Sequence, residues 1–152
     1  MPAEKPMVLF LCVNNSLRSQ MAEALLRHHA GDRFASCSAG LAPEPVHRLV
    51  PEVLAEIGVD ASHLETKPLR SFLARRGVRW AVILRAVDER NAPRLFPFAA
   101  RTLRWEVPDP GCDGCSEVAS RDAMRRTRDD IDARVRAWLA ELDGATRTSS
   151  AA

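Results

Sequence analysis

The sequence predicts one α/β domain built on a parallel, doubly wound sheet of about four strands. Apolar runs of strand length alternate with stretches of helical periodicity, and no internal repeat or linker divides the chain. The 152 residues suffice for one core and leave little for a second. In such a fold the ligand crevice lies beyond the carboxyl ends of the strands, so functional residues are expected where strands end.

The first half of the chain carries the clearest elements. Residues 8–12 are a run of β-forming apolar residues, which predicts a strand buried on both faces and central in the sheet. From Ser19 the apolar residues recur at helical spacing, and Gly31 is placed to end this helix. A second strand is expected over residues 34–38, closed by Gly40.

The second half continues the alternation. It predicts a helix over residues 46–57, strands over 80–84 and 103–107, and a long closing helix over 124–142. Pro51 falls in the first turns of its helix, where a missing N–H is tolerated. The residues from Gly144 are small and polar, so we expect one domain over 1–143 and a disordered tail over 144–152.

Composition and charge exclude several classes of function. The chain has 22 Lys and Arg against 20 Asp and Glu, a net charge of +2, which argues against binding to nucleic acid or membranes. The early apolar stretch, residues 7–13, is far shorter than the roughly 20 residues that cross a bilayer. We expect a monomeric, cytoplasmic protein with reduced thiols. Its four cysteines are Cys12, Cys37, Cys112 and Cys115, of which Cys37 is expected in the core.

The most informative segment joins the first strand to the first helix. It reads Cys12-Val13-Asn14-Asn15-Ser16-Leu17-Arg18-Ser19. A loop at a helix N-terminus presents backbone N–H groups to a tetrahedral oxyanion, and Arg18 can hold two of its oxygens. The same donors stabilise a thiolate at Cys12, and the Ser19 hydroxyl is placed to donate to the sulfur. The alternative is a buried Cys12 beside a solvated Arg18, but the position of the loop favours a nucleophile.

Four short motifs occur in a fixed order along the chain. They are Cys-x5-Arg-Ser at 12–19, Gln20-Met21-Ala22-Glu23, Ser38-Ala39-Gly40 and Asp109-Pro110. Together they resemble the low-molecular-weight tyrosine phosphatase family and, more narrowly, the arsenate reductases built on that fold. The resemblance spans residues 8–142 and implies a three-layer α/β fold with a nucleophilic Cys12 and an oxyanion-binding loop over residues 13–19.

The resemblance also implies that Asp109 is a general acid on a mobile loop. An oxygen that leaves phosphate or arsenate must be protonated, and a carboxylic acid near the Cys12 adduct can do this. The alternative is an ordinary aspartate in a turn, since Asp-Pro is common in turns.

The chain departs from the thioredoxin-coupled reductases at their two resolving cysteines. The corresponding positions in this chain are occupied by Leu84-Arg85 and Asn91-Ala92-Pro93, none of which is a cysteine. Three routes stay open. An external thiol reductant could attack the arsenic adduct, whether glutathione, mycothiol, bacillithiol, or a thioredoxin or glutaredoxin system. Cys112 or Cys115 could attack instead, or the protein could be a phosphatase that needs only water.

The Cys112-Asp113-Gly114-Cys115 segment has three interpretations. The pair could cycle as a local disulfide, form half of a zinc site, or consist of two incidental loop cysteines. No histidine has the spacing of a zinc motif, so we expect no metal site there.

The substrate class can be argued from what is missing. Tyrosine phosphatases of this fold carry aromatic residues after Asp-Pro, whereas Gly111 and Cys112 follow here and the chain has no Tyr. A small oxyanion needs no aromatic wall, which favours arsenate reduction with Cys12 as nucleophile. The alternatives are phosphomonoester hydrolysis through a cysteinyl-phosphate, and an oxyanion-binding or thiol-sensing module without turnover.

The resemblance raises the question of a potassium ion beside the loop. Similar reductases can bind it through groups matching Asn15, Glu23 and Ser38. Lys67 stands where a further acidic ligand would be, which argues against a cation in this chain.

Overall fold

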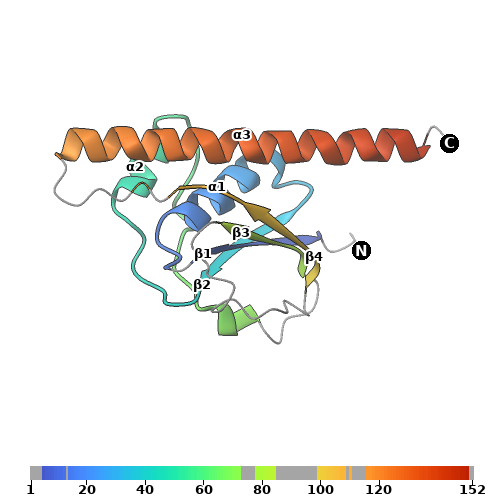
Figure 1. Ribbon diagram of the computed structural model, residues 1–152, viewed down its shortest axis with the longest axis horizontal. Helices are drawn as coiled ribbons and strands as arrows, with labels where there is room; N and C mark the ends of the chain where they lie inside the picture. The colour runs from blue at the N-terminus through green and yellow to red at the C-terminus, as the bar shows by residue number, and fades with distance from the viewer. Residues whose placement is uncertain are drawn as a thin grey trace.

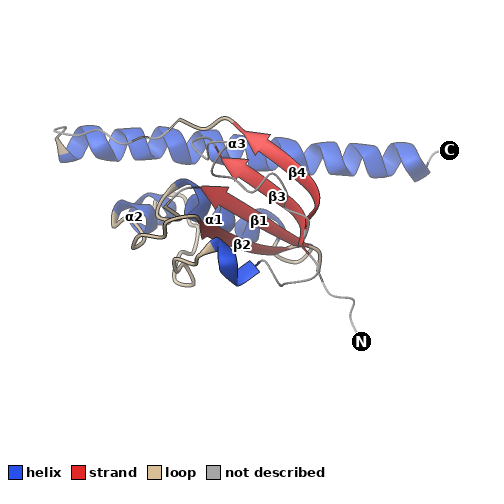
Figure 2. Ribbon diagram, turned by 60° about the horizontal axis from the view of Figure 1, so that its bottom comes forward, coloured by secondary structure: helices blue, strands red, loops and turns tan. Residues whose placement is uncertain are grey.

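A parallel sheet forms the centre of the computed structural model, which describes residues 5–12, 14–72, 78–84, 99–108, 110 and 116–150. Within these residues, four strands pair in parallel in the order β2-β1-β3-β4. They are β1 (Met7–Cys12), β2 (Ala35–Gly40), β3 (Val78–Leu84) and β4 (Ala99–Trp105). The first strand is therefore interior to the sheet, as predicted (Figure 2).

Helices lie on both faces of this sheet. They are α1 (Arg18–Ala30), α2 (Leu49–Ala55), the 3-10 helix η1 (Leu69–Phe72) and α3 (Glu117–Ser150). The first, second and last of these pack on one face, and η1 packs on the other (Figures 1 and 2). The predicted three-layer α/β class is confirmed.

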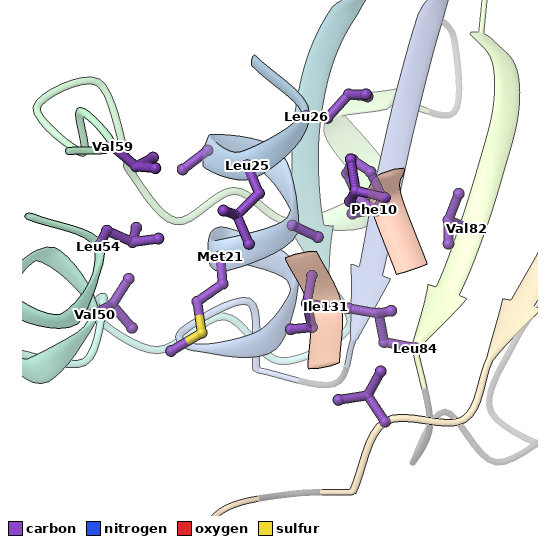
Figure 3. Close-up of a cluster of buried hydrophobic side chains, with 14 of the residues drawn as sticks. Phe10, Met21, Leu25, Leu26, Val50, Leu54, Val59, Val82, Leu84 and Ile131 are labelled. Carbon is purple, nitrogen blue, oxygen red and sulfur yellow. The ribbon is translucent and has the colours of Figure 1, made fainter. Parts of the chain in front are cut away.

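Side chains of β1 alternate between two hydrophobic cores. Val8 and Phe10 are buried with α1, α2 and α3, whereas Leu9 and Leu11 are buried with η1. Figure 3 shows Phe10 and Ile131 of α3 among the side chains of the larger core. Burial of each such side chain contributes roughly 1.5–3 kcal/mol, so the strand that ends at the predicted nucleophile is fixed from both sides.

Strand β4 and helix α2 begin and end at other residues than the sequence predicts. Strand β4 begins at Ala99 and ends at Trp105, whereas the apolar run predicted 103–107. Its first residues are not an apolar run, but their backbone pairs with β3, with Ala99 opposite Val78. Helix α2 is shorter than the predicted 46–57: His47 lies in the loop before it, where its N–H donates to the Ser16 carbonyl, and residues 56–58 form a turn after it.

Helix α3 extends past the predicted closing helix at both ends. Ser116 precedes its first turn and accepts a hydrogen bond from the Ala119 N–H at 3.2 Å. The helix also runs through Gly144 to Ser150, where the sequence predicts a disordered tail. One glycine costs an established helix only about 1 kcal/mol and no proline follows it. A domain boundary at residue 143 stays a prediction.

Among the described residues, no helix combines the length and the hydropathy needed to cross a membrane.

Charged side chains join the end of α2 to α3. The Glu56 carboxylate accepts hydrogen bonds from Arg125 Nη2 at 2.6 Å and from Arg128 Nη1 at 2.8 Å. Arg128 also donates to the Val53 carbonyl at 2.8 Å. The hydrogen bond and charge of Arg125, followed by those of Arg128, lower the pKa of Glu56 from its ordinary value of 4.5 to about 2.

This carboxylate gives a pH-dependent prediction. Glu56→Gln lowers the melting temperature at pH 7 by about 1–3 °C, because exposed ion pairs contribute little. The folded-state pKa of Glu56 lies below its unfolded value, so the stabilisation is present above about pH 4.5 and is lost as the pH falls towards 2. Thermal unfolding at pH 7, 5, 4 and 3 measures the difference.

The matched control is Glu141→Gln, at an exposed position further along α3. A difference between Glu56→Gln and the wild type that stays constant down to about pH 3 would contradict the assignment.

Candidate active site

The loop between β1 and α1 surrounds the sulfur of Cys12 with polar groups. Cys12 is the last residue of β1 and is 3% exposed. The Asn15 backbone N–H donates to Cys12 Sγ at 3.2 Å, and Ser19 Oγ lies 2.9 Å from the same sulfur. Asn15 and Ser19 are fully buried, so these contacts are shielded from water.

A chain of hydrogen bonds decides which way the Ser19 hydroxyl points. The Lys67 backbone N–H donates to Asn15 Oδ1 at 2.8 Å, which orients the amide so that Asn15 Nδ2 donates to Ser19 Oγ at 2.9 Å. Since Ser19 Oγ already accepts a hydrogen bond there, its own proton can be donated to Cys12 Sγ. The sulfur of Cys12 is thus placed to accept hydrogen bonds from the Asn15 N–H and the Ser19 hydroxyl.

Contacts from outside the loop fix its backbone. Asn15 adopts a left-handed conformation with φ 49°, which asparagine tolerates well. Its carbonyl accepts a hydrogen bond from Gln20 Nε2 at 2.8 Å. The carbonyls of Asn14 and Ser16 accept from the N–H groups of Glu44 and His47 at 2.9 and 2.8 Å. Carbonyls held in this way are kept from turning towards a bound anion.

Arg18 connects this loop to the segment after β4. It is the first residue of α1 and is 7% exposed, and its Nη1 donates to the Val107 carbonyl at 3.0 Å. Val107 stands two residues before Asp109 in the sequence. The anion-binding side chain expected from the sequence thus contacts the segment that leads to the expected general acid.

The structure brings Cys12, Asn15 and Ser19 into contact. Arg18 is the first residue of α1, and its Nη1 contacts the Val107 carbonyl. Asn14, Ser16 and Leu17 lie in the same loop. The other expected site residues, Val13, Asp109, Cys112 and Cys115, lie outside the described residues. The catalytic roles of all these residues stay predictions.

The positions of the missing resolving cysteines are partly described. Leu84 is a buried residue at the end of β3, whereas Arg85 and residues 91–93 lie outside the described part of the chain. Cys37 is half-buried in β2 and packs against the core on the η1 side of the sheet.

Three contributors to the loop were not assigned a role from the sequence. Gln20 bridges the carbonyls of Asn15 and Glu65, at 2.8 and 2.9 Å. The Lys67 N–H and the Val107 carbonyl act through the backbone, whose groups are the same in every residue type. Only the tertiary structure could identify the two backbone groups.

The residues beside the loop do not fit a bound potassium ion. The Glu23 carboxylate is 2% exposed and accepts a hydrogen bond from Ser38 Oγ at 2.9 Å. Lys67 Nζ lies 3.6 Å from Glu23 Oε1 and donates to the Glu65 carbonyl at 2.7 Å. A second cation there would be repelled by this ammonium. Within the described residues, no group of three or more His, Cys, Asp or Glu side chains could hold a metal ion.

His63 is the other basic side chain at Glu23. Its Nε2 lies 3.5 Å from Glu23 Oε2. Burial, and then the charge of Arg27, lower the pKa of His63, which favours its neutral form at neutral pH. Of these two basic side chains, Lys67 is therefore the one that brings a positive charge to this carboxylate.

Comparison with known proteins assigns the chain to a protein family. The model of the low molecular weight phosphotyrosine protein phosphatase family matches residues 7–148. The chain belongs to this family. The resemblance carried by the four motifs is thus confirmed over nearly the whole length of this phosphatase-family chain.

Named relatives of this family member include arsenate reductases. The chain is 28% identical to the arsenate reductase of Shouchella clausii over 132 residues, which is 87% of this chain and 94% of the relative. It is 26% identical to the arsenate reductase of Bacillus subtilis over 133 residues, 88% of this chain and 94% of the relative.

Solved structures agree with the fold. An arsenate reductase in the phosphate binding state superposes with a TM-score of 0.74 at 25% identity, covering 90% of this chain and 98% of the other. The Corynebacterium glutamicum thioredoxin-dependent arsenate reductase superposes with a TM-score of 0.73 at 30% identity, and the match covers 95% of this chain and 65% of that one.

The hydrogen bond between Ser19 and the sulfur can be tested directly. Ser19→Ala removes a donor and lowers the rate at which iodoacetamide alkylates Cys12 at pH 7 by about tenfold, corresponding to a hydrogen bond of about 1.4 kcal/mol. Peptide mass spectrometry separates Cys12 from the other cysteines. The control is Ser62→Ala, since Ser62 is bonded to Asp60 at an exposed turn. Equal alkylation rates in Ser19→Ala and wild type would show that the hydroxyl does not act on the sulfur.

Proposed function

We propose that this chain is an arsenate reductase in which Cys12 is the nucleophile. The observation that carries the proposal is the sulfur of Cys12, held by the Asn15 N–H and Ser19 Oγ at the carboxyl end of an interior strand. The identity with arsenate reductases over nearly the full length of both chains supports this assignment. A thiolate, an arginine and a loop at a helix N-terminus together suit attack on a tetrahedral oxyanion.

The proposed reaction has two chemical steps. The Cys12 thiolate attacks arsenic, a sulfur–arsenic bond forms, and one oxygen leaves as water after it receives a proton, with Asp109 as the proposed acid. A second thiolate then attacks the Cys12 sulfur and forms a disulfide. The electron pair of the sulfur–arsenic bond passes to arsenic, which is reduced from the +5 to the +3 state and leaves as arsenite.

The second thiol is proposed to come from outside the chain. Leu84 is a buried leucine at one place where thioredoxin-coupled relatives carry a resolving cysteine. The Corynebacterium glutamicum neighbour is a thioredoxin-dependent arsenate reductase, so thiol reductants as a class fit the family. We propose glutathione, mycothiol, bacillithiol or a thioredoxin or glutaredoxin system as reductant, in the cytoplasm, where such thiols are kept reduced.

Phosphomonoester hydrolysis is the second candidate, favoured by the family to which the chain belongs. It would use Cys12, Arg18 and Asp109 and needs only water for its second step. The absence of Tyr from the chain speaks against a phosphotyrosine pocket, which ranks this activity below arsenate reduction.

The nucleophile is tested by Cys12→Ser. Arsenite production with each thiol donor is expected to fall by at least about a thousandfold, because a serine hydroxyl is un-ionised at neutral pH. Cys37→Ser, in β2, is the matched control and should keep wild-type activity. Arsenate reduction near the wild-type rate in Cys12→Ser would exclude the assignment. Hydrolysis of an aryl phosphate without arsenate reduction would favour the phosphatase, and oxyanion binding without either activity would favour a binding module.

The source of the second thiol is tested by single turnover. We expect the double variant Cys112→Ser, Cys115→Ser to keep at least about half of the wild-type rate with a small thiol, because Asp113 disfavours a thiolate beside it. Mass spectrometry of the wild-type protein after one turnover without external thiol is the measurement, and incubation without arsenate is its control. A disulfide containing Cys112 or Cys115, formed with stoichiometric arsenite, would contradict the external route.

A further inference from the structure

A buried carboxylate lies beside the proposed oxyanion-binding loop, residues 13–19, which is called the oxyanion loop below. Glu23, in α1, is 2% exposed, and its Oε1 accepts a hydrogen bond from Ser38 Oγ. One neutral hydrogen bond does not compensate the loss of water around a charge, so a carboxylate buried in this way requires a nearby positive group.

Lys67 supplies that group from a separate segment of the chain. Its Nζ lies 3.6 Å from Glu23 Oε1, and the Glu65 carbonyl holds the ammonium at 2.7 Å. The side chain is only 22% exposed, so the pair is partly shielded from water and salt.

The same residue also holds the oxyanion loop. The backbone N–H of Lys67 donates to Asn15 Oδ1, the first link of the hydrogen-bond chain that ends at the Cys12 sulfur. Any movement of the Lys67 segment away from Glu23 would therefore pull on the loop. This makes Lys67 a positioning residue that acts through Asn15.

The positive group beside Glu23 is an ammonium, although nearly all of the basic residues in this chain are arginines. The chain has 22 Lys and Arg, but Lys5 and Lys67 are its only lysines. An ammonium is a compact point charge that accepts oxygen ligands from several directions, as a monovalent metal ion does, whereas a guanidinium is planar and directs its donors as a fork. At Glu23 the chain places the side chain that most resembles a bound monovalent cation.

We propose that the Lys67 ammonium is a built-in monovalent cation, which takes the place of potassium beside Glu23 and keeps the oxyanion loop in its binding geometry. The loop then needs no potassium. The inference rests on the proposed oxyanion-binding role of the loop, but its main measurement, thermal unfolding, does not depend on arsenate turnover.

Lys67→Gln tests the proposal, with Lys5→Gln as the matched control, since Lys5 is an exposed lysine bonded to the Gly31 carbonyl. Each protein is compared in potassium, sodium and tetramethylammonium chloride at one ionic strength. The melting temperature and the calorimetric affinity for inorganic phosphate are measured. The third variant, Glu23→Gln with Lys67→Gln, removes both charges.

The wild type and Lys5→Gln are expected to behave identically in the three salts. In tetramethylammonium chloride, Lys67→Gln should melt at least about 3 °C lower and bind phosphate at least about fivefold more weakly. Potassium chloride should restore at least about half of both losses, because Glu23 then recovers a cation. The double variant should melt higher than Lys67→Gln and should not respond to potassium.

Several outcomes would overturn the proposal. They are stabilisation of the wild type by potassium, wild-type behaviour of Lys67→Gln, and a loss in Lys67→Gln that potassium does not reduce. If Lys67→Gln does not fold in any of the salts, folding of the double variant supports the proposal and its failure to fold overturns it. Absence of phosphate binding by the wild type would instead count against the proposed function, whatever the melting temperatures show.

Discussion

The side chain of Asn15 is the link on which the geometry of the site depends. Its amide accepts from the Lys67 N–H on one side and donates to Ser19 Oγ on the other, while its own N–H reaches the Cys12 sulfur. The residue is fully buried and its backbone is left-handed. Few side chains combine a donor, an acceptor and tolerance of that backbone. An aspartate would lose the donor to Ser19, and a serine would be too short to span both partners.

The sheet fixes the position of Cys12, the residue at which the loop begins. Strand β1 is paired on both edges, with Cys12 opposite Gly40 of β2, and its two faces are buried in different cores. The position of the sulfur is thus set by packing, and the loop needs only to arrange its donors around that position. Regular structure thus supports the proposed nucleophile, and the loop supplies the groups that contact its sulfur.

Whether a feature of the site can be predicted from the sequence depends on how far apart in the chain its interacting residues are. Cys12, Arg18 and Ser19 are recognisable because eight consecutive residues contain the strand end, the loop and the start of the helix. The contribution of Lys67 to Asn15 was not predictable, because 52 residues separate the two and the donor is a backbone N–H.

The same reasoning explains the errors in element boundaries. Strand β4 begins at Ala99 because β3 offers it a backbone ladder, and a short non-apolar stretch gives no sign of such pairing. Helix α3 continues past Gly144 because helix propagation from an established segment is favourable, a cooperative effect that the composition of the tail does not reveal. Local patterns therefore predict the elements, and non-local pairing sets where they end.

The contact between Arg18 and Val107 has a consequence for affinity. A free arginine side chain samples many rotamers, and fixing it costs about 2 kcal/mol of conformational entropy. Since Arg18 is 7% exposed and bonded to the Val107 carbonyl, much of that entropy is lost during folding, before any ligand arrives. In the proposed oxyanion-binding role of Arg18, an anion would meet an arginine that is already immobilised and would be spared this loss, which amounts to as much as about thirtyfold in its dissociation constant. In that proposed role, the entropy cost of fixing Arg18 is taken from the stability of the folded chain and no longer reduces the affinity for the oxyanion.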